Sequence, residues 1–252
     1  SHDYCVPQAT RIVTRLDGRS FTRLTKEVHT FEAPFDERLR DHMTETTRHL
    51  MTCGFNILFG YTQSDEISLL FHPAEAAFGR KLRKLNSVLA GEASAKFSLL
   101  LGDQGTFDCR VVQLPDRQKI IDYFRWRSED AHRNSLSAHC YWRLRGTGDS
   151  ARQASRTLSG KSTAEKLALL AEHGIDFAEL PAWQRHGIGL SWETYAKEGL
   201  NPLTGKTTVA NRQRLRVDLE LPRGRAFDAY LNDLLDSNDP PSEDRADGAP
   251  AD

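Results

Sequence analysis

The stretch that decides the fold is residues 55–71, FNILFGYTQSDEISLLF. Phe55–Phe59 and Ile67–Phe71 are apolar runs rich in Phe, Ile and Leu, which favours two strands. Between them, Gln63–Glu66 is a polar segment typical of a tight turn. We therefore predict an antiparallel pair of strands with Asp65 in its turn.

A strand and a helix are predicted before this pair. Residues 11–16 alternate polar and apolar positions, which indicates a strand that stops at Asp17-Gly18. Apolar residues from Phe35 to Met51 recur at helical spacing, and Gly54 follows as a stop signal.

A helix and a strand are likewise predicted after the pair. Apolar residues from Phe78 to Leu100 predict a second amphipathic helix that ends near Gly102, and Asp108–Leu114 reads as a strand. The order β-α-β-β-α-β is the split βαβ pattern. We predict an α+β fold with a palm-like antiparallel sheet and its two helices on one face, an order that alone proves no function.

The second half of the chain reads as helical and then as a β-hairpin. Asp116 can cap a helix, Ser162–Glu165 is a capping box, and Gly174 is a helix stop. Residues 187–221 predict β-structure with a turn at 201–205. We divide the chain into a palm core at 1–115, a helical and β-hairpin extension of the same domain at 116–235, and a disordered acidic tail at 236–252.

The composition excludes several classes of protein. The 252 residues carry 34 Lys and Arg against 35 Asp and Glu, and without the acidic tail the net charge is +4. Collagen, coiled-coil and disulfide-rich chains do not have this composition. No apolar run approaches 18 residues, so we expect no membrane association, and the N-terminus has no signal-peptide core. The four cysteines form no CxxC pair, which favours a reducing, cytoplasmic location.

Two acids stand where strands end. Asp17 closes the first predicted strand and is followed by a glycine, and Asp65 lies in the turn of the strand pair. In a split βαβ fold the first strand can pair beside this hairpin, which would bring the two acids together. Paired carboxylates favour hard cations such as Mg²⁺. The alternative is that Asp17-Gly18 is only a turn and that Asp65 only caps the hairpin.

Four motifs resemble the tRNA-His guanylyltransferase family of 3′→5′ polymerases. They are Arg15–Phe21 (RLDGRSF), Gly60–Ser68 (GYTQSDEIS), Phe107–Val112 (FDCRVV), and Trp126-Arg127 with His132–Leu136 (HRNSL). The sequence from His132 through Trp142 resembles the bacterial "like protein" branch more closely than the eukaryotic enzyme. The four tryptophans at 126, 142, 183 and 192 are read as core or interface residues.

The resemblance implies an enzyme that adds nucleotides to the 5′ end of tRNA. Such enzymes activate a 5′-monophosphate with ATP or GTP, or begin from a 5′-triphosphate, and the 3′-OH of an incoming nucleotide then attacks. Asp17 and Asp65 would be catalytic and would hold two Mg²⁺ ions together with the Gly18 carbonyl. Templated repair of truncated tRNA is the expected reaction for the bacterial-like branch, beside guanylate addition to tRNA-His. Because family members form dimers and tetramers, the resemblance also implies a homotetramer.

The resemblance places further residues at the nucleoside triphosphate. Arg19, Ser20, Phe21 and Thr22 follow the first acid, Ser64 precedes the second, and the other expected contacts are Lys84, His132, Asn134 and Lys166. Arg110 can clamp a phosphate from its strand. Glu66 is expected to face away from the metal site, because side chains alternate along a strand. Before Pro34, where the resemblance places a triphosphate-contacting lysine in the eukaryotic branch, this chain has Glu32-Ala33, which bears on the activating nucleotide.

Basic residues predict an RNA-contacting surface. The residues expected to contact RNA are Arg80, Lys81, Arg83, Arg125, Arg127 and Arg133. The alternative function is another palm-type nucleotidyltransferase or nucleotide cyclase with a small acceptor, which would share the two acids but need no tRNA.

Overall fold

The computed structural model describes residues 4–200 and 207–237 and contains one six-stranded antiparallel sheet. The strand order is β4-β1-β3-β2-β5-β6. The strands are β1 (Arg11–Gly18), β2 (Ile57–Gln63), β3 (Glu66–Phe71), β4 (Phe107–Leu114), β5 (Ile188–Leu200) and β6 (Thr207–Asp218). The first four strands have the predicted split βαβ order, and this fold prediction is confirmed.

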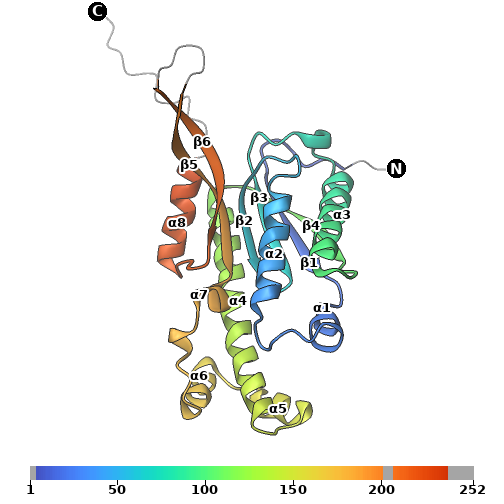
Figure 1. Ribbon diagram of the computed structural model, residues 1–252, viewed down its shortest axis with the longest axis vertical. Helices are drawn as coiled ribbons and strands as arrows, with labels where there is room; N and C mark the ends of the chain where they lie inside the picture. The colour runs from blue at the N-terminus through green and yellow to red at the C-terminus, as the bar shows by residue number, and fades with distance from the viewer. Residues whose placement is uncertain (1–3, 201–206, 238–252) are drawn as a thin grey trace, which may run out of the picture.

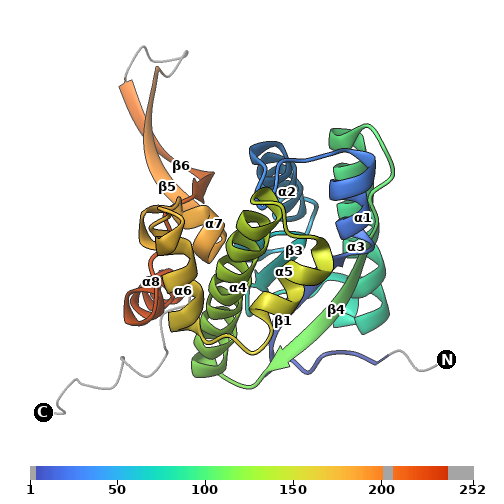
Figure 2. The same cartoon turned by 90° about the horizontal axis from the view of Figure 1, so that it is seen from below.

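Helices cover both faces of the sheet (Figures 1 and 2). Helices α2 (Glu37–Leu50) and α3 (Leu82–Leu101) pack on one face, as expected, around alternate residues such as Leu16, Ile67 and Leu69. The long helix α4 (Arg117–Gly146) and α8 (Arg225–Asp236) cover the other face, where Val13 and Leu70 point. This second core explains why β2 and β3 are buried along almost their whole length.

The remaining helices are short. They are α1 (Phe21–Arg23), η1 (Leu24–Val28), η2 (Ala77–Arg80), α5 (Ala151–Leu158), α6 (Thr163–Glu172), η3 (Phe177–Glu179) and α7 (Ala182–His186). The expected caps are present: Asp116 accepts from the Lys119 amide at 2.9 Å, and Ser162 and Glu165 form the capping box. Phe78 is an exception, since α3 begins only at Leu82 and the Phe78 ring is exposed.

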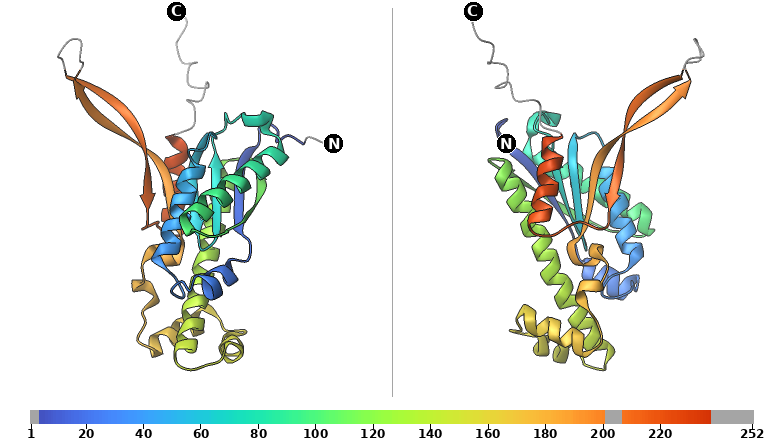
Figure 3. Two further views of the ribbon diagram at one scale, coloured as in Figure 1. Left: turned by 45° about the vertical axis from the view of Figure 1, so that its right-hand side comes forward. Right: turned by 90° about the vertical axis from the view of Figure 1, so that its left-hand side faces the viewer.

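The strands β5 and β6 form the predicted C-terminal hairpin. Only the base of β5 pairs with β2, and the rest of the hairpin extends away from the body (Figure 3). Its predicted turn at 201–205 lies outside the described residues. So does the predicted acidic tail from residue 238 onward, whereas Asp236, where we placed the tail's start, is the last residue of α8. Among the residues with assigned structure, no helix has the length and apolar character needed to cross a bilayer.

The start of α2 depends on one buried acid. Asp36 is the N-cap, and it accepts from the amides of Glu32 and Arg38, each at 2.7 Å, and from the Arg38 guanidinium at 2.8 Å. Burial opposes the charged form, but these hydrogen bonds outweigh it and lower the pKa of Asp36 to about 2. The ionised side chain therefore stabilises the folded state at neutral pH.

We predict that Asp36→Asn lowers the free energy of unfolding at pH 7 by about 2 kcal/mol. The folded pKa is depressed, so this contribution is complete above pH ~4 and is lost as the pH falls toward 2. Urea unfolding of both proteins across this range measures the difference. A difference that stays constant from pH 7 to pH 2.5 would contradict the assignment.

Candidate functional site

The pairing of β1 with β3 brings the two predicted acids together. Asp17 lies opposite Glu66 in the register, one residue from Asp65. The amide of Gly18 donates a hydrogen bond of 3.0 Å to the Asp65 carbonyl, which joins the end of β1 to the β2–β3 turn. Asp17 and Asp65 are therefore at the same end of neighbouring strands, as the topology predicts.

Two backbone features hold this corner. Ser64 opens the two-residue turn with φ of 55°, in the left-handed region. A Cβ on Gly18 would lie 2.5 Å from the Phe21 ring, so only glycine allows α1 to fold directly against the end of β1. Phe21 is buried against Phe97 and Phe107, and this contact anchors the loop that follows Asp17.

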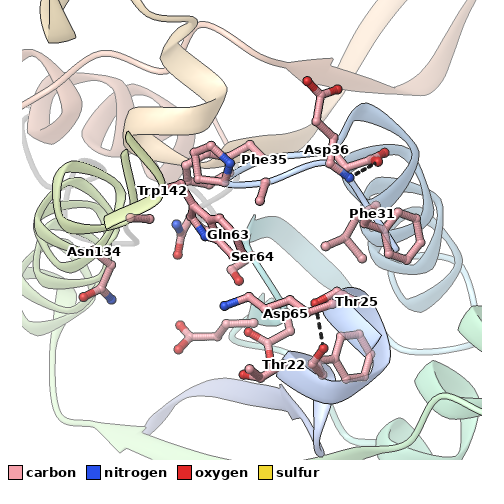
Figure 4. Close-up of a pocket in the computed structure, with 18 of the residues that line it drawn as sticks. Thr22, Thr25, Phe31, Phe35, Asp36, Gln63, Ser64, Asp65, Asn134 and Trp142 are labelled. Atoms are coloured by element: carbon pink, nitrogen blue, oxygen red, sulfur yellow. Dashed lines mark hydrogen bonds between the residues drawn. The ribbon is translucent and has the colours of Figure 1, made fainter. Parts of the chain in front are cut away.

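The acids open into a cavity of about 450 Å³ (Figure 4). Its walls come from β1 and α1, from the segment before α2, from the β2–β3 turn and from α4. The lining residues include Asp17, Phe21, Thr22, Lys26, Phe31, Glu32, Phe35, Gln63, Ser64, Asp65, Glu66, Arg127, Asp130, Asn134 and Trp142. The lining combines carboxylates with aromatic rings, an arrangement that suits a ligand with a charged part and a flat apolar part.

A chain of ion pairs runs along one wall of the cavity. Arg15 contacts Asp17 and Glu66, each at 3.1 Å, and Arg127 contacts Glu66 at 3.0 Å and Asp130 at 2.6 Å. The expectation that Glu66 faces away is wrong, because residues opposite each other in an antiparallel pair share a face, and Glu66 is opposite Asp17. Burial raises the pKa of Glu66, and both arginines oppose that shift.

Asp65 has no such cationic partner among the residues that the structure describes. Burial raises the pKa of Asp65, and the negative charge of Asp17 raises it further. Within residues 4–200 and 207–237, no group of three or more His, Cys, Asp or Glu side chains is arranged to hold a metal. Two carboxylates beside a backbone carbonyl nevertheless fit Mg²⁺, which is commonly bound through one or two carboxylates and keeps several waters.

The predicted nucleotide contacts fall into two groups. Phe21, Thr22, Ser64 and Asn134 line the same cavity as the two acids. The other predicted contacts lie outside this cavity. Arg19 and Ser20 line a neighbouring hollow beside Thr106, and His132 points away from the cavity. Lys84 lies against the Phe78 ring, Arg110 is exposed on β4, and Lys166 donates a hydrogen bond to Ser137.

The predicted RNA-contacting set also divides. Arg80 is buried and donates to backbone carbonyls, and Arg125 holds α4 to α8 through Asp228, so the structure gives these two residues internal partners. Arg127 is buried in the cavity wall. Arg83 and Arg133 are exposed and Lys81 is half-buried, so these three are placed where RNA could reach them.

The sequence interpretation missed Trp142. We expected a core or interface role, but its ring lines the cavity, and the Lys26 ammonium lies 5.1 Å from the ring centroid. Asn134, Ala138 and Trp142 are spaced by four residues on α4 and therefore share one face of the helix. This spacing, counted from Asn134, is the signal that would have identified Trp142.

Comparisons with known proteins agree with this geometry. Residues 1–115 match the family described as tRNAHis guanylyltransferase, and residues 118–221 match the Thg1 C-terminal domain. A probable tRNA(His) guanylyltransferase of Mus musculus is 33% identical over 232 residues, with 85% of this chain and 77% of that protein covered. Its counterpart in Drosophila melanogaster is 36% identical over 186 residues, and the match spans 65% of that relative's length.

Solved structures share the fold. The tRNA(His) guanylyltransferase from Saccharomyces cerevisiae superposes with a TM-score of 0.70 at 25% identity, covering 76% of this chain and 89% of that one. A bacterial tRNA(His) guanylyltransferase (Thg1)-like protein in complex with ATP has a TM-score of 0.68 at 27% identity, covering 92% and 93%. With the motifs, the fold and the paired acids in agreement, the chain belongs to the tRNA(His) guanylyltransferase family.

Proposed function

We propose that this chain is a nucleotidyltransferase that adds nucleotides in the 3′→5′ direction to the 5′ end of tRNA. The observation that carries the proposal is the single cavity that Asp17 and Asp65 share with the aromatic rings on α4 and before α2. Family membership supports the reaction class. The bacterial relative's complexes with ATP and with GTP support nucleoside triphosphates as substrates.

The two acids and the Gly18 carbonyl would hold Mg²⁺. When bound, two such ions stabilise the attacking and leaving oxygens of a phosphoryl transfer. The chain's own residues then position the reactants. Arg15 and Arg127 fix Glu66 and Asp17 on the cavity wall, and the rings of Phe31, Phe35 and Trp142 offer faces for a nucleobase.

The finer reaction we propose is templated repair of 5′-truncated tRNA. A 5′-monophosphate is first activated by ATP or GTP, with release of pyrophosphate, and the 3′-OH of the incoming nucleotide then displaces the activating group. The proposal includes a homotetramer in the cytoplasm. None of the four cysteines forms a disulfide in the described parts of the chain, which is compatible with a reducing compartment.

Extension of a tRNA that lacks its first nucleotide tests the proposal. With Mg²⁺, ATP and each labelled nucleoside triphosphate, we expect incorporation of the nucleotide complementary to the opposing 3′-strand base. Asp17→Asn and Asp65→Asn should lower the rate at least about a hundredfold, because phosphoryl transfer relies on charge neutralisation at these oxygens.

Asp233→Asn is the matched control for this experiment. Asp233 is exposed on α8 and does not line the cavity, so its variant loses a carboxylate of the same kind and should keep full activity. Full activity in Asp17→Asn would refute the assignment. Incorporation of guanylate whatever the template would replace repair by obligate guanylate addition.

We predict that Asp65→Asn stabilises the protein in the absence of divalent cations. Burial and the charge of Asp17 both raise the pKa of Asp65, so its ionised form opposes folding at pH 7. Urea unfolding in EDTA should show the variant as more stable than the parent. Added Mg²⁺ should stabilise only the parent, through binding to the folded state. A variant that is less stable in EDTA would contradict this account.

We predict that Glu32→Lys lowers the KM for the activating nucleotide about three- to tenfold. Glu32 lines the cavity in the segment before Pro34, where the resemblance places a lysine in the eukaryotic branch, and reversing its charge removes repulsion of a triphosphate. Glu27→Lys is the control, since Glu27 is exposed on η1 and pairs with Arg23. Equal changes in both variants would show a general charge effect and not a site effect.

A further inference from the structure

A second cavity, of about 690 Å³, lies apart from the first. It is bounded by α4, α6, η3, α7 and the segment before α8. One part of its lining is apolar and the other is basic. The lining residues are His132, Leu167, Ala168, Ala171, Gly174, Ile175, Asp176, Phe177, Ala178, Arg185 and Arg223.

This cavity and the catalytic cavity are on opposite sides of α4. The catalytic cavity takes Asp130, Asn134 and Ala138 from the helix, which follow one another at intervals of four residues. His132 lies two residues from Asp130 and from Asn134, about 200° around the helix axis, and it lines the second cavity. A ligand in the second cavity therefore occupies a separate site.

Two arginines carry the positive charge of this second site. The Arg185 Nε donates to the Leu180 carbonyl at 2.7 Å, which holds the side chain at the rim. Arg223 is exposed just before α8. In the described part of the chain neither guanidinium makes an ion pair, although Glu129 faces Arg223 from α4 and Asp176 lines the cavity with its carboxylate accepting from the Ala178 amide.

Two histidines, His132 and His186, lie beside the arginines. The rings of His132 and His186 stack with centroids 5.3 Å apart, and His186 is 3% exposed. The Nδ1 atoms of both are buried without a hydrogen-bond partner among the described residues. Burial, followed by the charges of Arg223 and Arg185, lowers the pKa of His132 to about 4 and that of His186 to about 3.

The positive charge of one arginine also acts on the other arginine. Burial and then the charge of Arg185 lower the pKa of Arg223, and Glu129 only partly opposes them. Within the described residues, none of the charges that shift the pKa of either imidazole belongs to a carboxylate. The site thus has an excess of positive potential beside an apolar surface, and an anion would relieve it.

We propose that Arg185 and Arg223 form an anion site that takes a phosphate ester. Guanidinium groups match the geometry of phosphate oxygens, and the adjoining apolar wall of Leu167, Ile175 and Phe177 suits the sugar or base that a phosphate ester carries. The phosphate ester can come from the RNA backbone or from a free nucleoside triphosphate. The site is distinct from the one at which the reaction is proposed to occur.

Binding measurements on Arg185→Gln/Arg223→Gln test the proposal without relying on catalysis. We expect the affinity for tRNA to fall about tenfold and the magnitude of its salt dependence to decrease by about one unit of slope. Calorimetric titration with inorganic tripolyphosphate serves as the second probe. The control is Arg152→Gln/Arg156→Gln, which removes the same charge from exposed positions on α5.

The outcomes separate the two sources. A loss confined to tRNA supports an RNA phosphate, and a loss confined to one class of tripolyphosphate site supports a free nucleotide. A loss of both supports one site for which the two compete. Losses no larger than in the control overturn the proposal. Arg223→Gln alone is the second variant in case the double variant misfolds, because the Arg223 side chain is exposed and makes no ion pair within the described residues.

Discussion

The antiparallel register of β1 against β3 is the constraint on which the site depends. It sets Asp17 opposite Glu66 and lets the Gly18 amide reach the Asp65 carbonyl at 3.0 Å. A shift of one residue would send Asp17 to the face covered by α2 and α3, where Leu16 now lies buried. The apolar alternation of β1 therefore fixes the geometry of the candidate site as well as the core.

The helices on the two faces of the sheet differ in what they contribute to the structure. Helices α2 and α3 close a core that is apolar along the sheet, whereas α4 closes the other face and then continues beyond it. Along that extension, α4 presents Arg127, Asp130 and Asn134 to the cavity that holds Asp17 and Asp65, and it presents His132 to the second cavity. One long helix thus connects the packing of the sheet with both polar sites.

Short sequence patterns predicted correctly the features that depend only on neighbouring residues. The strand alternation, the caps at Asp116 and Ser162 and the tight turn at Asp65 are short-range signals, and the structure contains all of them. The position of Glu66 was missed because alternation along one strand does not state which residue faces it across the sheet. Trp142 was missed because nothing in its local sequence distinguishes a tryptophan in a cavity wall from one in a core. The RNA contact predicted for Arg80 was wrong because its guanidinium is buried against carbonyl groups such as that of Thr10, far away in the sequence.

We propose that metal and nucleotide meet at Asp17 and Asp65. A crystal structure of the protein with Mn²⁺ and a non-hydrolysable nucleoside triphosphate measures this most directly. We predict anomalous density within bonding distance of both carboxylates, with the base against the rings of Phe31, Phe35 or Trp142. Density for metal and triphosphate at another place, with Asp17 and Asp65 free of ligands, would contradict it.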